Sequence, residues 1–367
     1  MREHRTFLWV VKSLGIALLA ALPASAQTPS PALLVLAKSE AMLAIVDPAS
    51  LQVVERVPVG PDPHEIVASP DGTLAYISNY GGLDSELHTI TVVDLVNRKP
   101  LPAIDLGALH SAHGLAFAGG KLYFTVETNK AIGRYDPATK NVDWVLGTGQ
   151  DRTHMVWVSK DLDRIVTSNV SSGTISIIER VSMPMRGFGP PPGGAPGLGP
   201  APGIHPPPGD PRKTWEVTSV RSGNGSEGFD VSPDGKEIWA ANAGDATVTI
   251  IDLAGKRATQ TVPIGVNGAN RLKFTPDGAR VFVSGLGFGG RTGSDLVVLD
   301  AASRKEIKHF DLGGGAEGIL MVLDGSRAFV AVGGAGYVAV VDLKTLEVTG
   351  RISPGKGPDG LAWAVRK

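Results

Sequence analysis

Short apolar runs alternate with turn signals in a unit that recurs along most of this chain. Each unit opens with a polar and a small residue and continues with an apolar strand, a Ser-Pro-Asp-Gly-like turn and a second apolar strand, before a third and a fourth strand. The clearest copies of the opening part of the unit, from the polar residue to the Gly of the turn, are residues 64–72, 227–235 and 270–278. β-branched runs bounded by turn residues predict strands, and no stretch shows a sustained helical period. Because one such unit can bury its apolar face only against its neighbours, the repeat predicts a series of packed sheets.

The spacing of the repeat predicts how many sheets there are. Most units lie roughly 40–50 residues apart, which matches a four-stranded propeller blade. One longer step, between the third and fourth units, contains an insertion. Aligned on the residue before each innermost strand, the seven positions are His64, His113, His154, Glu227, Asn270, Glu317 and Asp359.

The seventh unit is divided between the two ends of the chain. Residues 359–365 supply an inner strand, and then the chain stops. Residues 33–36, 42–47 and 52–59 supply a second, third and fourth strand with no first strand before them. Pairing the two parts closes the ring and removes open sheet edges. The sequence therefore predicts an all-β fold, a single seven-bladed β-propeller of four-stranded antiparallel blades over residues 27–367.

The second strands carry a further motif. They read Tyr-Ile-Ser-Asn at 76–79, Val-Thr-Ser-Asn at 166–169 and Trp-Ala-Ala-Asn at 239–242. With the preceding Ser-Pro-Asp-Gly turns, the chain resembles the YVTN-repeat family of bacterial and archaeal β-propellers, which includes surface-layer-type repeat proteins. The resemblance covers about residues 31–367.

This resemblance implies a fold and an exported or surface location, but hardly an activity. Three blades depart from the motif, because Val126, Gly285 and Val332 stand where the Asn falls. More distantly, the architecture is similar to that of seven-bladed lactonases and streptogramin lyases. Since one fold supports many functions, that similarity is an analogy only.

Residues 1–26 have the pattern of a secretory signal peptide. Three basic residues precede an apolar run at 14–22, and a small-x-small site ends at Ala26. The apolar run is too short to span a bilayer comfortably. We expect cleavage after Ala26 and a periplasmic or secreted protein; an uncleaved N-terminal anchor is the alternative. After cleavage no transmembrane span is expected.

The composition and the missing motifs exclude several classes of function. The absence of cysteine excludes disulfides, metal–thiolate sites, cysteine nucleophiles and haem attachment. A net charge of −1, without basic runs, gives no field that attracts nucleic acid, so no nucleic-acid partner is expected. No nucleophile elbow, zinc-protease motif or dinucleotide fingerprint occurs. The missing catalytic motifs favour a binding protein over an enzyme, and we expect a monomer.

The seven aligned residues are the candidate site, because in a closed propeller they face one another around one mouth of the channel. All are polar, although the strands they open are apolar. Three interpretations stay open. The residues could bond neighbouring blades, as the repeated histidine of WD40-type propellers does; they could bind a small-molecule ligand or a protein partner; or they could hold a divalent metal. Imidazole and carboxylate are suitable metal ligands, and the predicted set is His64, His113, His154 and Glu227.

Arg271 breaks the repeat, because its equivalents are mostly glycines. An arginine beside the mouth can clamp the carboxylate or phosphate of a ligand. The alternative is a salt bridge to a ring carboxylate such as Glu227 or Glu317. Two long loops expected on the same face, 80–88 and 286–295, would shape a rim over the mouth.

A Pro/Gly-rich insertion at about 182–213 interrupts the third blade. Such a composition buries too little apolar surface to offset its ordering entropy. We expect it to leave from the face opposite the ring, either as a tolerated surface insertion or as a Pro-rich docking segment for a partner.

Two function hypotheses follow. The first is an exported binding or scaffolding propeller that presents its polar mouth to a small ligand or a protein partner. The second is a lactonase-like, metal-assisted hydrolase or lyase, in which the bound ion activates water or a carbonyl. The first leads, because the repeat specifies the fold and only the mouth hints at chemistry. No cofactor is required by the first; a divalent metal is required by the second.

Overall fold

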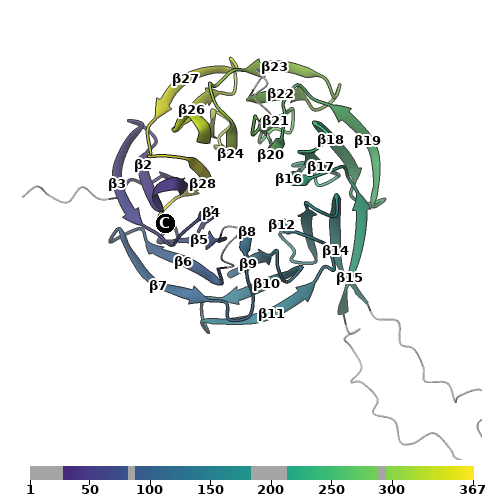
Figure 1. The fold of residues 1–367 in the computed structure, drawn as a ribbon, viewed down its shortest axis with the longest axis horizontal. Helices are drawn as coiled ribbons and strands as arrows, with labels where there is room; N and C mark the ends of the chain where they lie inside the picture. Colours follow the sequence, from purple (N-terminus) through teal and green to yellow (C-terminus); the bar gives the residue numbers. More distant parts are fainter. Residues whose placement is uncertain (1–27, 82–86, 183–212, 288–294) are drawn as a thin grey trace, which may run out of the picture.

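Seven four-stranded antiparallel sheets stand like blades around a central axis (Figure 1). The computed structural model describes residues 28–81, 87–182, 213–287 and 295–367. The predicted signal segment, the interior of the insertion and the middle of both rim loops lie outside these residues. The predicted seven-bladed propeller is confirmed.

In every blade the two strands nearest the axis are antiparallel neighbours. The innermost strands are β4 (Pro63–Ala68), β8 (Ala112–Ala118), β12 (Thr153–Val158), β16 (Ser226–Val231), β20 (Ala269–Phe274), β24 (Ala316–Met321) and β28 (Pro358–Ala364). The second strands are β5 (Leu74–Asn79), β9 (Lys121–Val126), β13 (Arg164–Asn169), β17 (Glu237–Asn242), β21 (Arg280–Gly285), β25 (Arg327–Val332) and β1 (Ala32–Ala37).

The two outer strands complete each blade. The third strands are β6 (Thr89–Asp94), β10 (Ala131–Asp136), β14 (Thr174–Ser182), β18 (Thr247–Asp252), β22 (Leu296–Asp300), β26 (Tyr337–Asp342) and β2 (Met42–Asp47). The outermost strands are β7 (Lys99–Asp105), β11 (Asn141–Gly147), β15 (Lys213–Arg221), β19 (Arg257–Pro263), β23 (Glu306–Phe310), β27 (Glu347–Ile352) and β3 (Gln52–Pro58). Ser182 pairs with Lys213, so β14 and β15 run up to the edges of the insertion.

The ring closes as predicted, by a strand from each end of the chain. β28 pairs with β1, in a register that sets Ala364 opposite Ala32 and Ala362 opposite Leu34. β1 also pairs with β2, so it has a partner on both sides. All six of its residues are buried. Closure therefore pairs the edge of β1 that the N-terminal three-stranded unit would otherwise leave open, which is the physical reason for sharing one blade between the termini.

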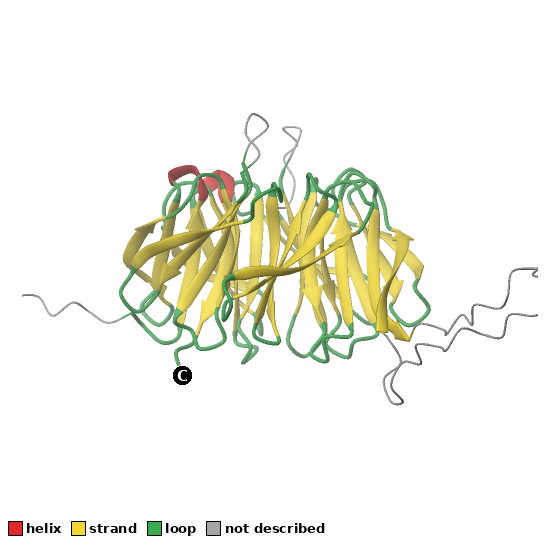
Figure 2. Ribbon diagram, turned by 90° about the horizontal axis from the view of Figure 1, so that it is seen from below, coloured by secondary structure: helices red, strands yellow, loops and turns green. Residues whose placement is uncertain are grey.

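The core lies between adjacent blades. Phe282 of β21 belongs to the same buried cluster as Val330 of β25, and Trp239 of β17 to the same cluster as Val283 of β21. Each blade thus covers the apolar face of the next, as the repeat required. Among the described residues, no helix is long and apolar enough to cross a membrane. The two helical segments in the described part of the chain are single 3₁₀ turns, η1 (Lys38–Glu40) and η2 (Gly333–Ala335), and both lie on one face of the disc (Figure 2).

The Asn of the YVTN-like motif has a structural role. Asn79 donates to the hydroxyls of Thr89 and Thr91 on the third strand, at 2.9 and 3.0 Å. Asn242 makes the same two bonds to Thr247 and Thr249. This amide fixes the register of the second and third strands, so the motif itself reports on fold.

Candidate functional site

Every inner strand has a β-bulge at the same place. In β4, Pro63 pairs with Asn79 and Ile66 with Ile77, so His64 and Glu65 stand opposite the single residue Ser78. The other six inner strands have the corresponding irregularity. A bulge re-aims side chains next to a site. It lets both the aligned residue and its successor reach the channel.

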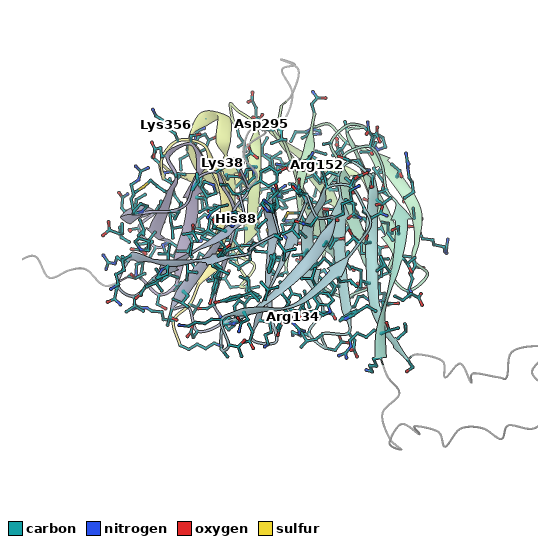
Figure 3. The ribbon with its side chains drawn as sticks, turned by 60° about the horizontal axis from the view of Figure 1, so that its bottom comes forward. Lys38, His88, Arg134, Arg152, Asp295 and Lys356 are labelled. Atoms are coloured by element: carbon teal, nitrogen blue, oxygen red, sulfur yellow. The ribbon has the colours of Figure 1, made fainter. Side chains whose placement is uncertain are left out.

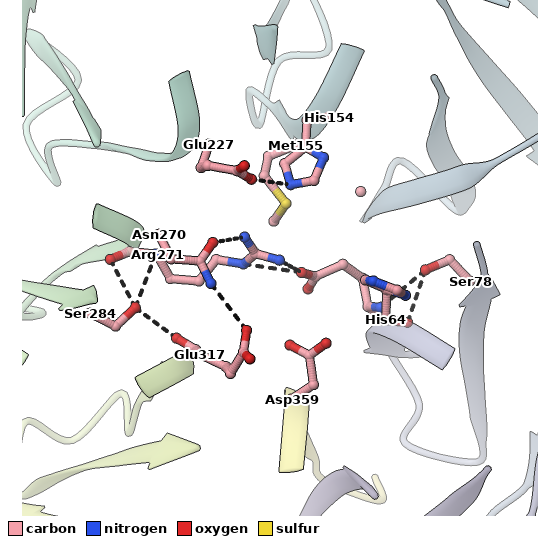
Figure 4. A network of polar contacts seen from close by, with 12 residues as sticks. His64, Ser78, His154, Met155, Glu227, Asn270, Arg271, Ser284, Glu317 and Asp359 are labelled. Carbon is pink, nitrogen blue, oxygen red and sulfur yellow. Dashed lines mark hydrogen bonds and ion pairs between the residues drawn. The ribbon is translucent and has the colours of Figure 1, made fainter. Parts of the chain in front are cut away.

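The structure gathers all of the predicted site residues at one mouth of the channel. They line a cavity of about 410 Å³, together with Lys38, Tyr80, Arg152 and Leu286. Lys38 and Arg152 lie on the same face of the disc, away from Arg134 (Figure 3). The seven aligned residues are called the mouth ring below: His64, His113, His154, Glu227, Asn270, Glu317 and Asp359 (Figure 4).

Further site residues, which sequence reasoning missed, directly follow the second strands. The last residue of each second strand pairs with the residue just before a mouth-ring residue, as Val126 pairs with Ala112. Lys38, Tyr80 and Glu127 occupy this following position in three adjacent blades. Aligning the chain on the ends of the second strands, rather than the starts of the first, would have found them.

His154 is the centre of the most densely bonded part of the site. Its Nδ1 bonds to Glu127 Oε1, and its Nε2 lies 2.9 Å from Glu227 Oε2, an ion pair at an angle poor for a hydrogen bond. Burial alone would lower the pKa of His154, but Glu227 and Glu127 outweigh it and raise the pKa. Burial would likewise raise the pKa of Glu227, yet His154, Arg271 and Arg152 hold it at about 2. The three groups therefore form a buried, charged triad.

Glu127 is held by residues on both sides. Its Oε2 accepts from the Tyr80 hydroxyl at 2.6 Å and from Arg152 Nε at 3.2 Å, while Oε1 faces His154. Only 6% of Glu127 is exposed. Burial opposes ionisation, but His154, Arg152 and Tyr80 lower the pKa of Glu127 below its ordinary value. A buried carboxylate with this many donors is fixed in position.

The other two histidines are neutral. Burial lowers the pKa of His113 well below its ordinary value, and the charge of His154, whose ring centroid is 3.7 Å away, adds to this. Burial also lowers the pKa of His64. Lys38 Nζ donates to His64 Nε2 at 2.6 Å. In contrast, Nδ1 of His113 is buried and has no hydrogen-bond partner.

Arg271 spans the channel, and its partner corrects the sequence prediction. It does not bridge to Glu227 or Glu317; its Nη2 lies 2.6 Å from Oε1 of Glu65, on the far side of the ring. Its Nη1 donates to Asn270 Oδ1 at 2.6 Å. Glu65 was missed, although it breaks the run of glycines at this position as Arg271 does. The guanidinium of Arg271 therefore joins blades on opposite sides of the channel through its bonds to a carboxylate and an amide.

The glycines at the equivalent position allow close packing of the inner strands. A Cβ on Gly114 would lie 2.4 Å from the carbonyl oxygen of His154, and one on Gly318 would lie 2.4 Å from that of Asp359. Any side chain there would have to displace the backbone of the next blade. The mouth ring is therefore set at a fixed, narrow spacing.

The remaining part of the ring is acidic. Asn270 Nδ2 donates to Glu317 Oε2 at 3.2 Å, and Lys38 Nζ lies 3.5 Å from Asp359 Oδ2. Burial, followed by the charge of Asp359, raises the pKa of Glu317 to about 7. Oδ1 of Asp359 is buried and has no hydrogen-bond partner.

The four predicted metal ligands do not come together as one set. Among the described residues, the group whose ligand atoms lie within 4.8 Å of one another is His113, Glu127 and His154. His64 is occupied by Lys38, and Glu227 contacts His154 from the other side. Two of the predicted histidines thus remain candidates, with a carboxylate that the sequence did not suggest.

No protein-family model and no curated protein matches the chain. Solved structures do. A functionally unknown protein from Desulfotomaculum acetoxidans is similar at 12% identity and a TM-score of 0.69, covering 92% of this chain and 100% of that one. A candidate 6-phosphogluconolactonase from Bacteroides uniformis is similar at 13% identity and a TM-score of 0.68, covering 91% and 99%. Hydrazine synthase from Kuenenia stuttgartiensis is similar at 18% identity and a TM-score of 0.61, covering 82% and 89%.

These likenesses show the fold alone. They support the class defined by the topology, a seven-bladed β-propeller with a polar channel mouth. At such low identity no activity carries over. The closer resemblance to the YVTN-repeat family stays a prediction.

Proposed function

We propose that this chain is an exported propeller that binds a small polar ligand in the mouth of its channel. One observation carries the proposal: two buried polar atoms, His113 Nδ1 and Asp359 Oδ1, line the same cavity without a protein partner. An unsatisfied buried polar atom costs about 1–3 kcal/mol, so a fold does not gain from keeping two. Export rests on the signal-like residues 1–26.

A purely structural role accounts for only part of the ring. Arg271 with Glu65, Asn270 with Glu317 and Lys38 with His64 are bonded across or between blades. These contacts brace the mouth. Burial and the neighbouring Asp359 raise the pKa of Glu317, and this placement of two carboxylates does not brace the mouth. Groups whose pKa is shifted in this way cluster at functional sites.

The cavity favours a small ligand over a protein partner. Its volume of about 410 Å³ lies within the range of small-molecule sites. Its walls carry three cationic side chains, Lys38, Arg152 and Arg271, and three carboxylates, Glu227, Glu317 and Asp359. Such walls match a ligand with a donor or cationic group toward Asp359 and Glu317 and an acceptor or anionic group toward Lys38 and Arg152. Zwitterions and hydroxycarboxylic acids have this character.

The test is a thermal-shift screen of mature protein in chelator, with small amino acids, hydroxycarboxylic acids and polyols as probes, followed by calorimetry of the strongest compound. We expect at least one compound to raise the melting temperature. Asp359→Asn and Glu317→Gln should each weaken its binding by roughly tenfold or more, because each removes a charged hydrogen-bond partner. Glu347→Gln, an exposed carboxylate of the outermost strand β27, is the matched control. If no probe binds and the mouth variants change only stability, the ring is structural.

A further inference from the structure

The histidine side of the mouth contains a second feature, a group of ligand atoms that includes one from His113, a residue that the small-ligand proposal also uses. His113, Glu127 and His154 offer ligand atoms within 4.8 Å of one another, and all three are buried. His113 and His154 are only 2% and 3% exposed. Two imidazoles and a carboxylate are a known donor set for zinc and other first-row divalent metals.

We propose that His113, His154 and Glu127 form a binding site for a divalent transition metal, zinc in the first place. The proposal does not depend on the small polar ligand. His113 also has a buried Nδ1 for which the protein supplies no hydrogen-bond partner. In a tetrahedral site with bonds near 2.0–2.2 Å, ligand atoms stand about 3.3–3.6 Å apart. The ligand atoms, which lie within 4.8 Å of one another, would have to move closer together on binding a metal.

The surrounding contacts are those that orient metal ligands. On Glu127, Tyr80 and Arg152 occupy Oε2 and leave Oε1 on the side of His154. On His154, Nε2 lies 2.9 Å from Glu227, so the metal would take Nδ1 in place of the proton now shared with Glu127. A carboxylate beside the other ring nitrogen of a ligating imidazole commonly helps to orient the ring.

The carboxylates already beside His154 can offset the charge of a divalent ion. Glu127 and Glu227 carry two negative charges beside His154, and a divalent ion that displaces the imidazole proton offsets both. The absence of cysteine excludes thiolate ligands, so imidazole and carboxylate are the ligands that this site offers to a transition metal. Because His113, His154, Tyr80 and Arg152 line the cavity, a fourth coordination position would be accessible to water or to an oxygen of a small molecule.

The experiment measures metal binding by the mature chain, purified without a polyhistidine tag and stripped with chelator. Zn²⁺ is titrated by calorimetry, and Co²⁺ is added as a spectroscopic probe of tetrahedral geometry. We expect one ion per chain. Replacing a ligand, in Glu127→Gln or His113→Leu, should abolish saturable binding. Replacing an orienting residue, in Tyr80→Phe or Glu227→Gln, should weaken it by roughly 10–100-fold.

Two histidine variants are the matched controls. His64→Gln alters a mouth-ring histidine outside the group, and His88→Gln alters an exposed one that contacts Asp105. Both should bind metal as the wild type does, and so should the ligand-site variant Asp359→Asn. Melting curves of the stripped variants establish that each is folded. If His113→Leu does not fold, Tyr80→Phe still tests the proposal. Absence of stoichiometric binding by the wild type overturns the proposal. Loss of binding in His64→Gln, with retention in Glu127→Gln, would assign the ion to a different set.

Discussion

The two sides of the channel mouth share one backbone geometry but differ in how their charges are neutralised. On the histidine side, formed by β4, β8, β12 and β16, His154 lies between Glu127 and Glu227. On the acidic side, formed by β20, β24 and β28, Glu317 has a neutral amide and a second carboxylate as neighbours. The first arrangement holds its carboxylates ionised, whereas the second raises the pKa of Glu317 to about 7.

This difference shows that the repeat fixes the position of a side chain and its neighbours fix its state. Glu227 and Glu317 occupy the same place in their blades, at the second residue of β16 and β24. One meets an imidazole of the preceding blade and the other meets a carboxylate of the following blade. Arg271 joins the two sides through Glu65. Three variants, in order of expected effect, test this comparison.

The brace between the two sides should show the largest effect. Arg271→Met leaves Glu65, whose side chain is 16% exposed, without its cation; breaking a fully buried pair from one side costs about 3–5 kcal/mol, which is an upper bound for this pair. Adding Glu65→Leu should recover most of that loss, because the uncompensated charge is then removed. Urea unfolding at pH 7 measures both. A double variant as unstable as the single one would show that the two residues are not coupled.

The acidic side should be sensitive to pH. In the unfolded chain the Glu317 carboxyl ionises near 4.5, whereas in the folded protein its pKa is about 7, because of burial and Asp359. Wild-type stability therefore falls as pH rises between these values. Glu317→Gln does not titrate, so above pH 7 it should be more stable than the wild type by about 1–3 kcal/mol, and the difference should disappear near pH 4.

Unfolding curves at pH 4 and pH 8 measure this difference, with Glu347→Gln as the control on an exposed outer strand. Arg271 and Lys38 also face Glu317 and act in the opposite direction, which limits the effect. A stability difference that is the same at both pH values would mean that the pKa of Glu317 is the same in the folded and the unfolded protein.

On the histidine side, the protein should lose little stability when the imidazole of His113, whose Nδ1 has no hydrogen-bond partner, is replaced. In metal-free protein, His113→Leu removes a buried Nδ1 that bonds to nothing, so the change in stability should stay within about 1 kcal/mol. His113→Gln, which adds polar atoms at the same place, should be less stable than His113→Leu. Thermal unfolding in chelator compares the two. A large loss in His113→Leu would show that the ring has a structural partner.

The blade count, the shared seventh blade and the identity of the mouth ring could all be predicted from the sequence. Each follows from a local signal repeated at one spacing, and closure follows from the missing first strand at one terminus and the single strand at the other. The prediction for Arg271 was wrong in its partner. Glu65 lies on the far side of the ring, and only the channel width determines whether a guanidinium reaches an adjacent carboxylate or an opposite one.

Glu127 illustrates a different limit. It follows a second strand, whereas the ring was aligned on the starts of the first strands, so it stood outside that alignment. The register of β8 with β9 brings it beside the next blade, where it meets His154. A contact between neighbouring blades depends on how sheets pack face to face, which strand periodicity does not encode.

By itself, the sequence determined a seven-bladed ring with seven polar residues at one mouth, because short-range patterning and hydrophobic burial fix strands and their stacking. Only the tertiary structure decided which of those residues pair, which nitrogen and oxygen have no partner, and where imidazoles and a carboxylate converge. The reason is physical: charge state and coordination depend on distances of a few ångströms between blades, and these are set by backbone packing at glycines such as Gly114 and Gly318.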